Sequence, residues 1–253
     1  MRVFRTTRDG ALIVNADDWG RTRETTDRTL ECLRCRAVSS VSAMVFMEDS
    51  ERAAMIAQEH GIDTGLHLNF TTAFSGDKYP AALIAHHQRI AAYLLRHSLA
   101  PVVFNPWLRS SFEYVVESQL AEFERIYGRA PNRLDGHHHM HLCANVLLGG
   151  LLPSGTIVRR HFTFNTDEKN VVNRTYRKMS DRFLARRHQV VDRFLSLPPL
   201  TPPSRIQRIV DEARRFVVEI ETHPINTTEH QFLVGGDIFR YTGNLSIAHG
   251  FVL

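Results

Sequence analysis

The chain has 253 residues, of which 43% are hydrophobic and 23% charged, and its formal net charge is +4. This composition is ordinary for a globular protein with a substantial core. No apolar run approaches the roughly 18 residues that a membrane-spanning helix needs, and the first residues lack the apolar region of a signal peptide. We therefore expect a single cytoplasmic domain, residues 1–253, with no membrane partner.

The positive charge is concentrated in one part of the chain. Residues 159–193 contain ten Lys or Arg and four Asp or Glu, a balance of +6 that exceeds the net charge of the whole chain. The cations are spread over an amphipathic segment and are not interleaved with exposed aromatic residues, so a nucleic-acid surface is the weaker interpretation. A solvated helix face, or one that attracts an anionic substrate, is the stronger one.

Strand and helix patterns alternate along the chain. In order, the sequence predicts a strand at 11–18, a helix at 22–36, a strand at 37–46, a helix at 50–60, a strand at 62–70, helices at 81–99 and 111–127, a strand at 133–141, a helix at 142–152, a strand at 156–164, helices at 169–188 and 206–215, and a strand at 216–224. A capping box, Ser110 with Glu113, predicts the start of the fourth helix. Such alternation predicts an α/β fold, a TIM-barrel-like and incomplete or distorted (β/α) barrel with six to eight parallel strands.

The three cysteines predict no disulfide framework. Cys32 and Cys35 form a CxxC pair, but it lies inside a helical pattern and has no second pair that would complete a zinc site. A reducing compartment is the default expectation for such a chain.

Reactive side chains stand at the predicted C-terminal ends of four strands. These are the acids Asp17 and Asp18, then His67, the histidine run 137–141, and finally Glu219 with His223. In a β/α barrel the C-terminal ends of the strands converge on one mouth, where active sites are built. We therefore expect these side chains to form one site.

The histidine run is the densest part of this set. If it continues the strand, alternate side chains share a face, and His137, His139 and His141 point one way. Imidazole is the commonest metal ligand and titrates near neutral pH. A solvated, accidentally histidine-rich loop is the alternative.

One carboxylate and two imidazoles can hold a divalent ion with positions left for water. A second carboxylate can take a proton from that water, and a separate histidine can protonate a leaving group. This inventory fits metal-assisted hydrolysis. It also fits a non-haem iron oxygenase, although the oxygenase triad usually has a close His-x-Asp pair.

Four ordered motifs carry a family resemblance. They are Asn15-Ala16-Asp17-Asp18-Trp19-Gly20, Gly65-Leu66-His67-Leu68-Asn69-Phe70-Thr71, Asp135-Gly136-His137-His138-His139-Met140-His141 and Glu219-Ile220-Glu221-Thr222-His223-Pro224. In these motifs the chain resembles the YdjC-like carbohydrate deacetylases, a family that includes the chitooligosaccharide deacetylases. The resemblance implies a TIM-barrel-like fold, one divalent metal ion and removal of acetyl groups from N-acetylated sugars.

The resemblance also implies a role for individual residues. Asp18, His67 and His137 become the metal ligands, Asp17 the general base and His223 the acid that protonates the amine. Five further residues are expected to bind the sugar: His139, His141, Asn69, Arg159 and Glu219.

Several points stay open at this stage. The metal is either Mg²⁺ or Zn²⁺, and the chain is either a monomer or a homodimer. The expected partner is a small carbohydrate. The runner-up functions are a metal hydrolase of another amide or ester, and a basic module that binds sugar or nucleic acid without catalysis.

Overall fold

The computed structural model of the protein describes residues 10–77, 79–164 and 171–251. The strands are β1 (Ala11–Trp19), β2 (Ser40–Ala43), β3 (Thr64–Leu68), β4 (Arg133–Gly136), β5 (Ile157–Val158), β6 (Arg193–Ser196) and β7 (Val217–Thr222). The α-helices are α1 (Arg23–Arg34), α2 (Ser50–His60), α3 (Ala81–Leu94), α4 (Arg109–Tyr127), α5 (Ala144–Gly149), α6 (Val171–Leu184), α7 (Pro203–Ala213), α8 (Thr227–Val234) and α9 (Asp237–Thr242). Three 3₁₀-helices complete the set: η1 (Ala100–Val102), η2 (Pro106–Leu108) and η3 (His137–Leu142).

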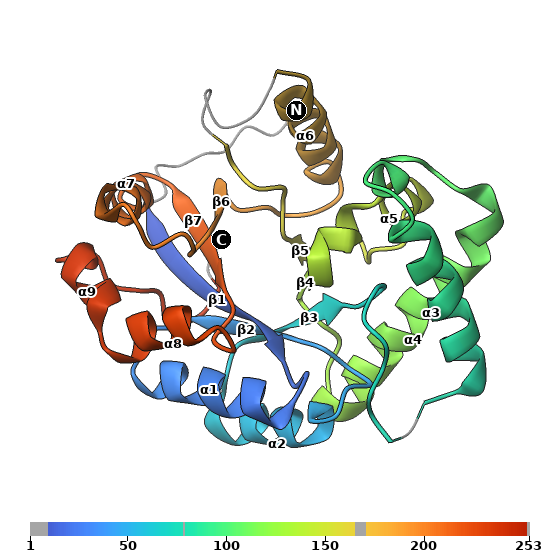
Figure 1. Cartoon of the computed structure of the whole chain (residues 1–253), viewed down its shortest axis with the longest axis horizontal. Helices are drawn as coiled ribbons and strands as arrows, with labels where there is room; N and C mark the ends of the chain where they lie inside the picture. The colour runs from blue at the N-terminus through green and yellow to red at the C-terminus, as the bar shows by residue number, and fades with distance from the viewer. Residues whose placement is uncertain (1–9, 78, 165–170, 252–253) are drawn as a thin grey trace.

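The seven strands form one parallel sheet in the order β5-β4-β3-β2-β1-β7-β6. The sheet curls on itself and the helices surround it, as Figure 1 shows. The edge strands β5 and β6 do not pair with each other. Backbone hydrogen bonds instead join each of them to a segment outside the sheet, from Val158 N to Gln189 O and from Thr163 N to Phe194 O. The prediction of an incomplete, TIM-barrel-like fold with six to eight parallel strands is confirmed.

Side chains on β1 show how the barrel is layered. Leu12, Val14 and Ala16 face outward into the apolar core between strands and helices, and the intervening side chains face the barrel interior. The interior changes from apolar to charged along the strand, from Ile13 to Asp17. Because parallel strands present their C-terminal ends at one side of the barrel, the charged side chains collect at that mouth.

Several predicted elements have different limits in the structure. The strand expected at 37–46 is limited to β2, and the strand expected at 156–164 to the two residues of β5. The helix expected at 81–99 ends with α3 at Leu94. The helix expected at 169–188 is α6, and its expected first two residues lie outside the described part of the chain.

Two regions held structure that the sequence analysis did not assign. Strand β6 lies between the basic helix and the proline-rich link, and helices α8 and α9 lie in the C-terminal region. Beyond α9, Ile247 forms a parallel bridge with Leu12 on β1. The C-terminal segment therefore packs at the N-terminal end of the barrel, opposite the mouth.

The expected histidine strand at 133–141 is wrong beyond Gly136. The chain turns there into η3, and His138 and His139 adopt left-handed backbone conformations with φ of 53° and 58°. A left-handed turn breaks the two-residue alternation of a strand. His137, His139 and His141 consequently do not share one face.

The predicted capping box is also wrong. Helix α4 begins at Arg109, so Ser110 lies within its first turn and does not cap it. Asn105 instead caps η2 by accepting a hydrogen bond from Trp107 N.

Cys32 and Cys35 are free thiols at the end of α1. Among the described residues, no helix combines the length and hydrophobicity that a membrane crossing requires.

Candidate active site

A bulge at the end of β1 places two consecutive acids at the mouth. The pairing of β1 with β2 shifts register between Ala16 and Trp19, and Asp18 has a φ of 66°. In a regular strand adjacent side chains point to opposite faces, whereas a bulge re-aims one of them. Asp17 and Asp18 are both buried and both lie near His67.

Asp18, His67 and His137 come together at the mouth, as their positions at strand ends predict. Each offers a ligand atom, and these atoms lie within 4.8 Å of one another. Asp18 Oδ1 lies 2.9 Å from His137 Nδ1 and 3.5 Å from His67 Nε2. Asp18 Oδ1 and His67 Nε2, which face each other, are buried, and neither makes a well-aligned hydrogen bond with a described residue. Buried polar atoms need a partner, so these atoms fit a bound cation.

His67 is oriented by Asp135, its register partner on β4. His67 Nδ1 lies 2.8 Å from Asp135 Oδ1, which leaves Nε2 directed toward Asp18. Burial alone would lower the pKa of His67, but the carboxylates of Asp17 and Asp135 outweigh it and raise that pKa to about 9. A histidine ligand that donates its other N–H to a carboxylate is the usual arrangement in metal sites. The surrounding charges therefore favour a cation at this place.

A second group, Asp17 with His67 and Asp135, also has ligand atoms within 4.8 Å of one another. Its carboxylates are already engaged by Arg159, whose Nη1 and Nη2 donate to Asp17 at 2.6 and 2.8 Å. Arg159 Nη2 also lies 3.0 Å from Asp135 Oδ2, and its Nε donates to Glu219 at 2.7 Å. The group that contains Asp18 is thus the better metal site.

The two hydrogen bonds from Arg159 hold Asp17 in position and help to keep it ionised. Burial alone would raise the pKa of Asp17, but the charges of Arg159 and His67 outweigh it and hold that pKa well below its usual range. The pKa of Asp18 is also lowered, because contacts with His137 and His67 outweigh burial. Both acids are carboxylates at neutral pH.

His223 follows β7 and completes the group expected at the mouth. Its backbone N–H donates to Glu229 Oε2 at 2.9 Å, which ties the turn after β7 to α8. Thr222, the residue before His223, is the register partner of Ala16 on β1, so His223 follows its strand beside Asp17. His223 is half-buried.

His139 and His141 were both expected to bind sugar. Of these two histidines, only His139 reaches the mouth. The side chain of His139 is 32% exposed, and its Nε2 lies 3.6 Å from Glu221 Oε2. Its ring meets Phe162 edge-on, with centroids 4.6 Å apart. His141 is fully buried, and its Nε2 donates to the carbonyl oxygen of Arg159.

The other three residues expected to bind sugar are buried. Arg159 and Glu219 form the ion pair beneath the mouth, and each is at most 2% exposed. Asn69 accepts hydrogen bonds from the backbone N–H groups of Thr71 and Thr72, and therefore shapes the loop after β3. These side chains support the site from below.

Sequence reasoning gave no role to Asp135 or Arg21, and it assigned His138 only to the histidines expected to line the sugar site. Asp135 orients His67, Arg21 Nη1 donates to Asp18 Oδ2 at 2.9 Å, and the His138 ring lies 4.0 Å from the His137 ring. For Asp135 a signal was present, because it stands two residues before His137 in the same motif. For Arg21 the sequence holds no such signal, because its contact with Asp18 depends on the turn after β1.

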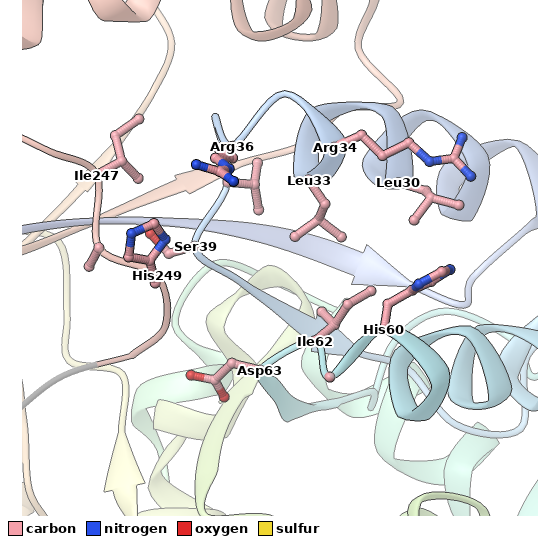
Figure 2. A pocket seen from close by; sticks show the side chains of 13 residues that line it. Leu30, Leu33, Arg34, Arg36, Ser39, His60, Ile62, Asp63, Ile247 and His249 are labelled. Atoms are coloured by element: carbon pink, nitrogen blue, oxygen red, sulfur yellow. The ribbon is translucent and has the colours of Figure 1, made fainter.

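A pocket of about 300 Å³ lies at the opposite end of the barrel. Figure 2 shows its wall of leucine and isoleucine side chains, with Arg34, Arg36, His60 and His249 around it. Arg34 and His60 stand in the last turns of α1 and α2. Basic residues are favoured at helix C-termini by the helix dipole, which accounts for their presence without a ligand. Since the pocket is distant from the mouth, it is not part of the site.

Comparisons with known proteins agree with this fold. Over 132 residues the chain is 30% identical to a chitooligosaccharide deacetylase of Serratia marcescens, covering 52% of this chain and 50% of that protein. It is 32% identical over 148 residues to a carbohydrate deacetylase of Mus musculus, covering 53% of this chain and 44% of that one. The chain thus spans about half the length of the curated relatives it matches.

Two solved structures share the fold. One is a proposed cellobiose-phosphate cleavage protein from Enterococcus faecalis V583, with a TM-score of 0.66, 16% identity and coverage of 95% of this chain and 97% of that one. The other is the catalytic domain of a peptidoglycan N-acetylglucosamine deacetylase from Eubacterium rectale, with a TM-score of 0.51, 10% identity and coverage of 100% and 93%. The model of the family described as YdjC-like protein matches residues 11–236, and the chain belongs to that family.

Proposed function

We propose that this protein is a metal-dependent hydrolase that removes acetyl groups from an N-acetylated mono- or oligosaccharide. The observation that carries the proposal is the grouping of Asp18, His67 and His137, with unpartnered buried atoms, beside the carboxylate of Asp17. The names of the curated relatives, chitooligosaccharide and carbohydrate deacetylase, support the same substrate class.

Asp18, His67 and His137 would hold one divalent ion. Bound there, the ion would supply Lewis acidity toward the acetamide carbonyl and would make a nearby water more acidic. Two imidazoles favour Zn²⁺ or another transition ion over Mg²⁺. Asp135 supports this role by keeping His67 Nδ1 occupied.

Asp17 is proposed as the general base. It removes a proton from the attacking water, whose oxygen bonds to the acetamide carbon. The lowered pKa makes its carboxylate a weak base, so it is matched to a water that is already acidic. Arg159 holds both oxygens of Asp17 and so restricts the direction in which the carboxylate can take up the proton.

His223 is proposed as the general acid. When the bond between the acetyl carbon and the sugar nitrogen breaks, the nitrogen needs a proton, because an amide anion is a very poor leaving group. His223 follows β7, which pairs with β1 in a register that puts Thr222 opposite Ala16 and so brings His223 to the strand end that carries Asp17. The products are acetate and the free amino sugar.

The decisive experiment is to incubate the protein, loaded separately with Zn²⁺ and Mg²⁺, with a panel of N-acetylated sugars and to measure released acetate. Acetate from at least one sugar, lost in Asp17→Asn, is the expected result. Hydrolysis of simple amides or esters but of no sugar would establish the runner-up, a metal hydrolase of another substrate class. Sugar binding without acetate release in the metal-loaded protein would establish the non-catalytic module.

A further inference from the structure

A buried amide lies beneath the proposed base, and the proposed chemistry gives it no role. Asn15 is completely buried on β1, two residues before Asp17, so both side chains point into the barrel interior. Its Nδ2 donates a hydrogen bond to Asp17 Oδ1 at 2.8 Å. We infer that Asn15, held by Ser42, is a positioning residue that occupies Oδ1 of Asp17 and leaves Oδ2 to take the proton, an inference that rests on the proposed function.

The two oxygens of Asp17 have different numbers of hydrogen-bond donors. Oδ1 accepts from Asn15 Nδ2 and from Arg159 Nη2, both at 2.8 Å. Among the described residues, Oδ2 accepts from Arg159 Nη1 alone, at 2.6 Å. A carboxylate oxygen has about two acceptor positions. Both positions of Oδ1 are therefore occupied, whereas Oδ2 keeps one that a water can use. Without Asn15 the guanidinium would hold both oxygens alike, and either could take the proton.

Partners on the other side of the amide fix its orientation. Asn15 Oδ1 accepts from Ser40 Oγ at 2.7 Å and from Arg133 Nη2 at 3.3 Å. A guanidinium has only donors and an ionised carboxylate has only acceptors. The reverse orientation would place N–H groups against Arg133 and an oxygen against the carboxylate of Asp17. The NH₂ group of Asn15 therefore faces Asp17.

Ser42 uses the second N–H of Asn15 and links it to the metal-ligand side of the site. Asn15 Nδ2 donates to Ser42 Oγ at 2.7 Å, and Ser42 Oγ donates to Asp135 Oδ2 at 2.5 Å. Asp135 in turn orients His67. Both N–H groups and both acceptor positions of the amide are thus engaged, and a fully satisfied buried network is rigid. It fixes Asp17 and Asp135 relative to each other.

The polar groups stand at neighbouring positions of β1 and β2. Ser40 is the register partner of Asn15, and Ser42 lies two residues further along β2 on the same face. Burying an amide and two hydroxyls costs free energy unless each is paired. Ile13, the preceding interior residue of β1, packs in an apolar cluster, so the barrel interior accommodates apolar side chains along this strand. The polar set is therefore best explained by the carboxylates above it.

The test is a double-mutant cycle between Asn15→Leu and Asp17→Asn in the metal-loaded protein, with acetate release from an N-acetylated sugar as the readout. Leucine keeps the volume of the side chain and removes its hydrogen bonds. Asn15→Leu should lower kcat about 10–100-fold, the effect of losing a charge-assisted hydrogen bond. KM should change less than about twofold, because Asn15 lies beneath the substrate and does not contact it.

The second arm of the cycle shows whether Asn15 acts through Asp17. In Asp17→Asn the group that Asn15 positions is no longer a base. Asn15→Leu should therefore change the residual rate of that variant less than about twofold. Equal factors in the two backgrounds would mean that the substitution damages the protein in general, and would overturn the inference.

Two serines on one face of β2 provide a matched comparison, which also decides the matter if Asn15→Leu does not fold. Ser42→Ala removes the partner of the N–H group beside Asp17 and should lower kcat about 3–10-fold. Ser40→Ala removes an equally buried hydroxyl from the other side of the amide, where Arg133 still donates, so its loss should be smaller. Thermal melting checks that both variants are folded. An equal or larger loss in Ser40→Ala would contradict the inference.

Crystal structures separate this inference from the proposed function. In Asn15→Leu the Asp17 carboxylate should depart from its single orientation, because Oδ1 keeps one donor, Arg159 Nη2, which it shares with Asp135. A displaced carboxylate in a protein that releases no acetate would leave the positioning role standing and the deacetylase proposal wrong. An unmoved carboxylate, together with acetate release at the wild-type rate, would leave the deacetylase proposal standing and the role of Asn15 wrong.

Discussion

His67 and Asp135 face each other as register partners on adjacent strands, with His67 Nδ1 and Asp135 Oδ1 2.8 Å apart. The contact fixes both the ring orientation of His67 and the nitrogen that remains for a metal. Asp135 is fully buried and also contacts Arg159, which in turn holds Asp17. One carboxylate thus connects the proposed metal site with the proposed base.

Asp135→Asn should weaken metal binding without abolishing it. The amide oxygen can still accept from His67 Nδ1, but the negative charge that increases the basicity of the ligand is lost. Substitution of such a supporting residue typically lowers metal affinity by about 10–100-fold. Calorimetric titration with Zn²⁺ measures the effect, and Glu117→Gln, which changes an exposed acid in the same way, is the matched control. Unchanged affinity in Asp135→Asn would contradict this role.

Asp17 and Asp18, the two consecutive acids at the end of β1, should have different functions that substitution can distinguish. Asp18→Asn should lose the bound ion, because a neutral amide is a poor substitute for the carboxylate ligand. Asp17→Asn should retain the ion and lose activity by a factor of about 10²–10⁴, the usual contribution of general-base assistance. Elemental analysis and acetate release measure the two effects, and thermal melting checks that each variant is folded. The opposite pattern would mean that the roles of the two acids are exchanged.

The parts of the site that could be predicted from sequence are those set by local pattern. A buried apolar run that ends in polar residues marks the C-terminal end of a parallel strand, and this placed Asp17, His67 and His223 at one mouth. Strand β6 has one fully buried side chain among its four residues, so it carries no clear apolar pattern, and it is defined by its pairing with β7.

Other parts depend on contacts between distant segments. The left-handed turn at His138 is accompanied by a contact between its Nδ1 and Thr71 Oγ1, 67 residues away. The partners of Arg159 come from β1, β4 and β7, so its burial beneath the site was not apparent from a basic stretch of sequence. Sequence gave the residue types at the mouth, whereas the fold decides which of them face the substrate.

Stability should fall in mild acid because of His87 on α3. Its Nε2 is buried without a partner among the described residues, and burial lowers its pKa to about 4. An unfolded histidine titrates near 6.5, so the unfolded chain binds this proton first. The contribution of His87 is fully present above pH 6.5 and is lost as the pH falls toward 4, on the order of 2 kcal/mol. Urea unfolding at pH 7 and pH 5 should show a smaller loss in His87→Leu than in the wild type. An equal loss in both would exclude His87 as the cause.

His223 has a role that can be tested by the choice of leaving group. Its backbone is fixed by Glu229, and the register of β7 with β1 places it beside Asp17. Two simpler roles compete with proton donation, namely support of the loop and shaping of the turn before Pro224. Glu229→Gln serves as the matched control, because it weakens the anchor of the turn and leaves the imidazole in place.

If His223 protonates the leaving nitrogen, His223→Ala should lower kcat on an acetamide by about 10²–10⁴. The same variant should lose much less on an acetate ester of a phenol, since a phenolate can depart without a proton. Metal content should equal that of the wild type, because His223 is not among the proposed ligands. Glu229→Gln should lower both rates by similar factors, since a displaced turn affects binding of either substrate. Equal losses on the amide and the ester in His223→Ala would show that His223 positions the substrate and donates no proton.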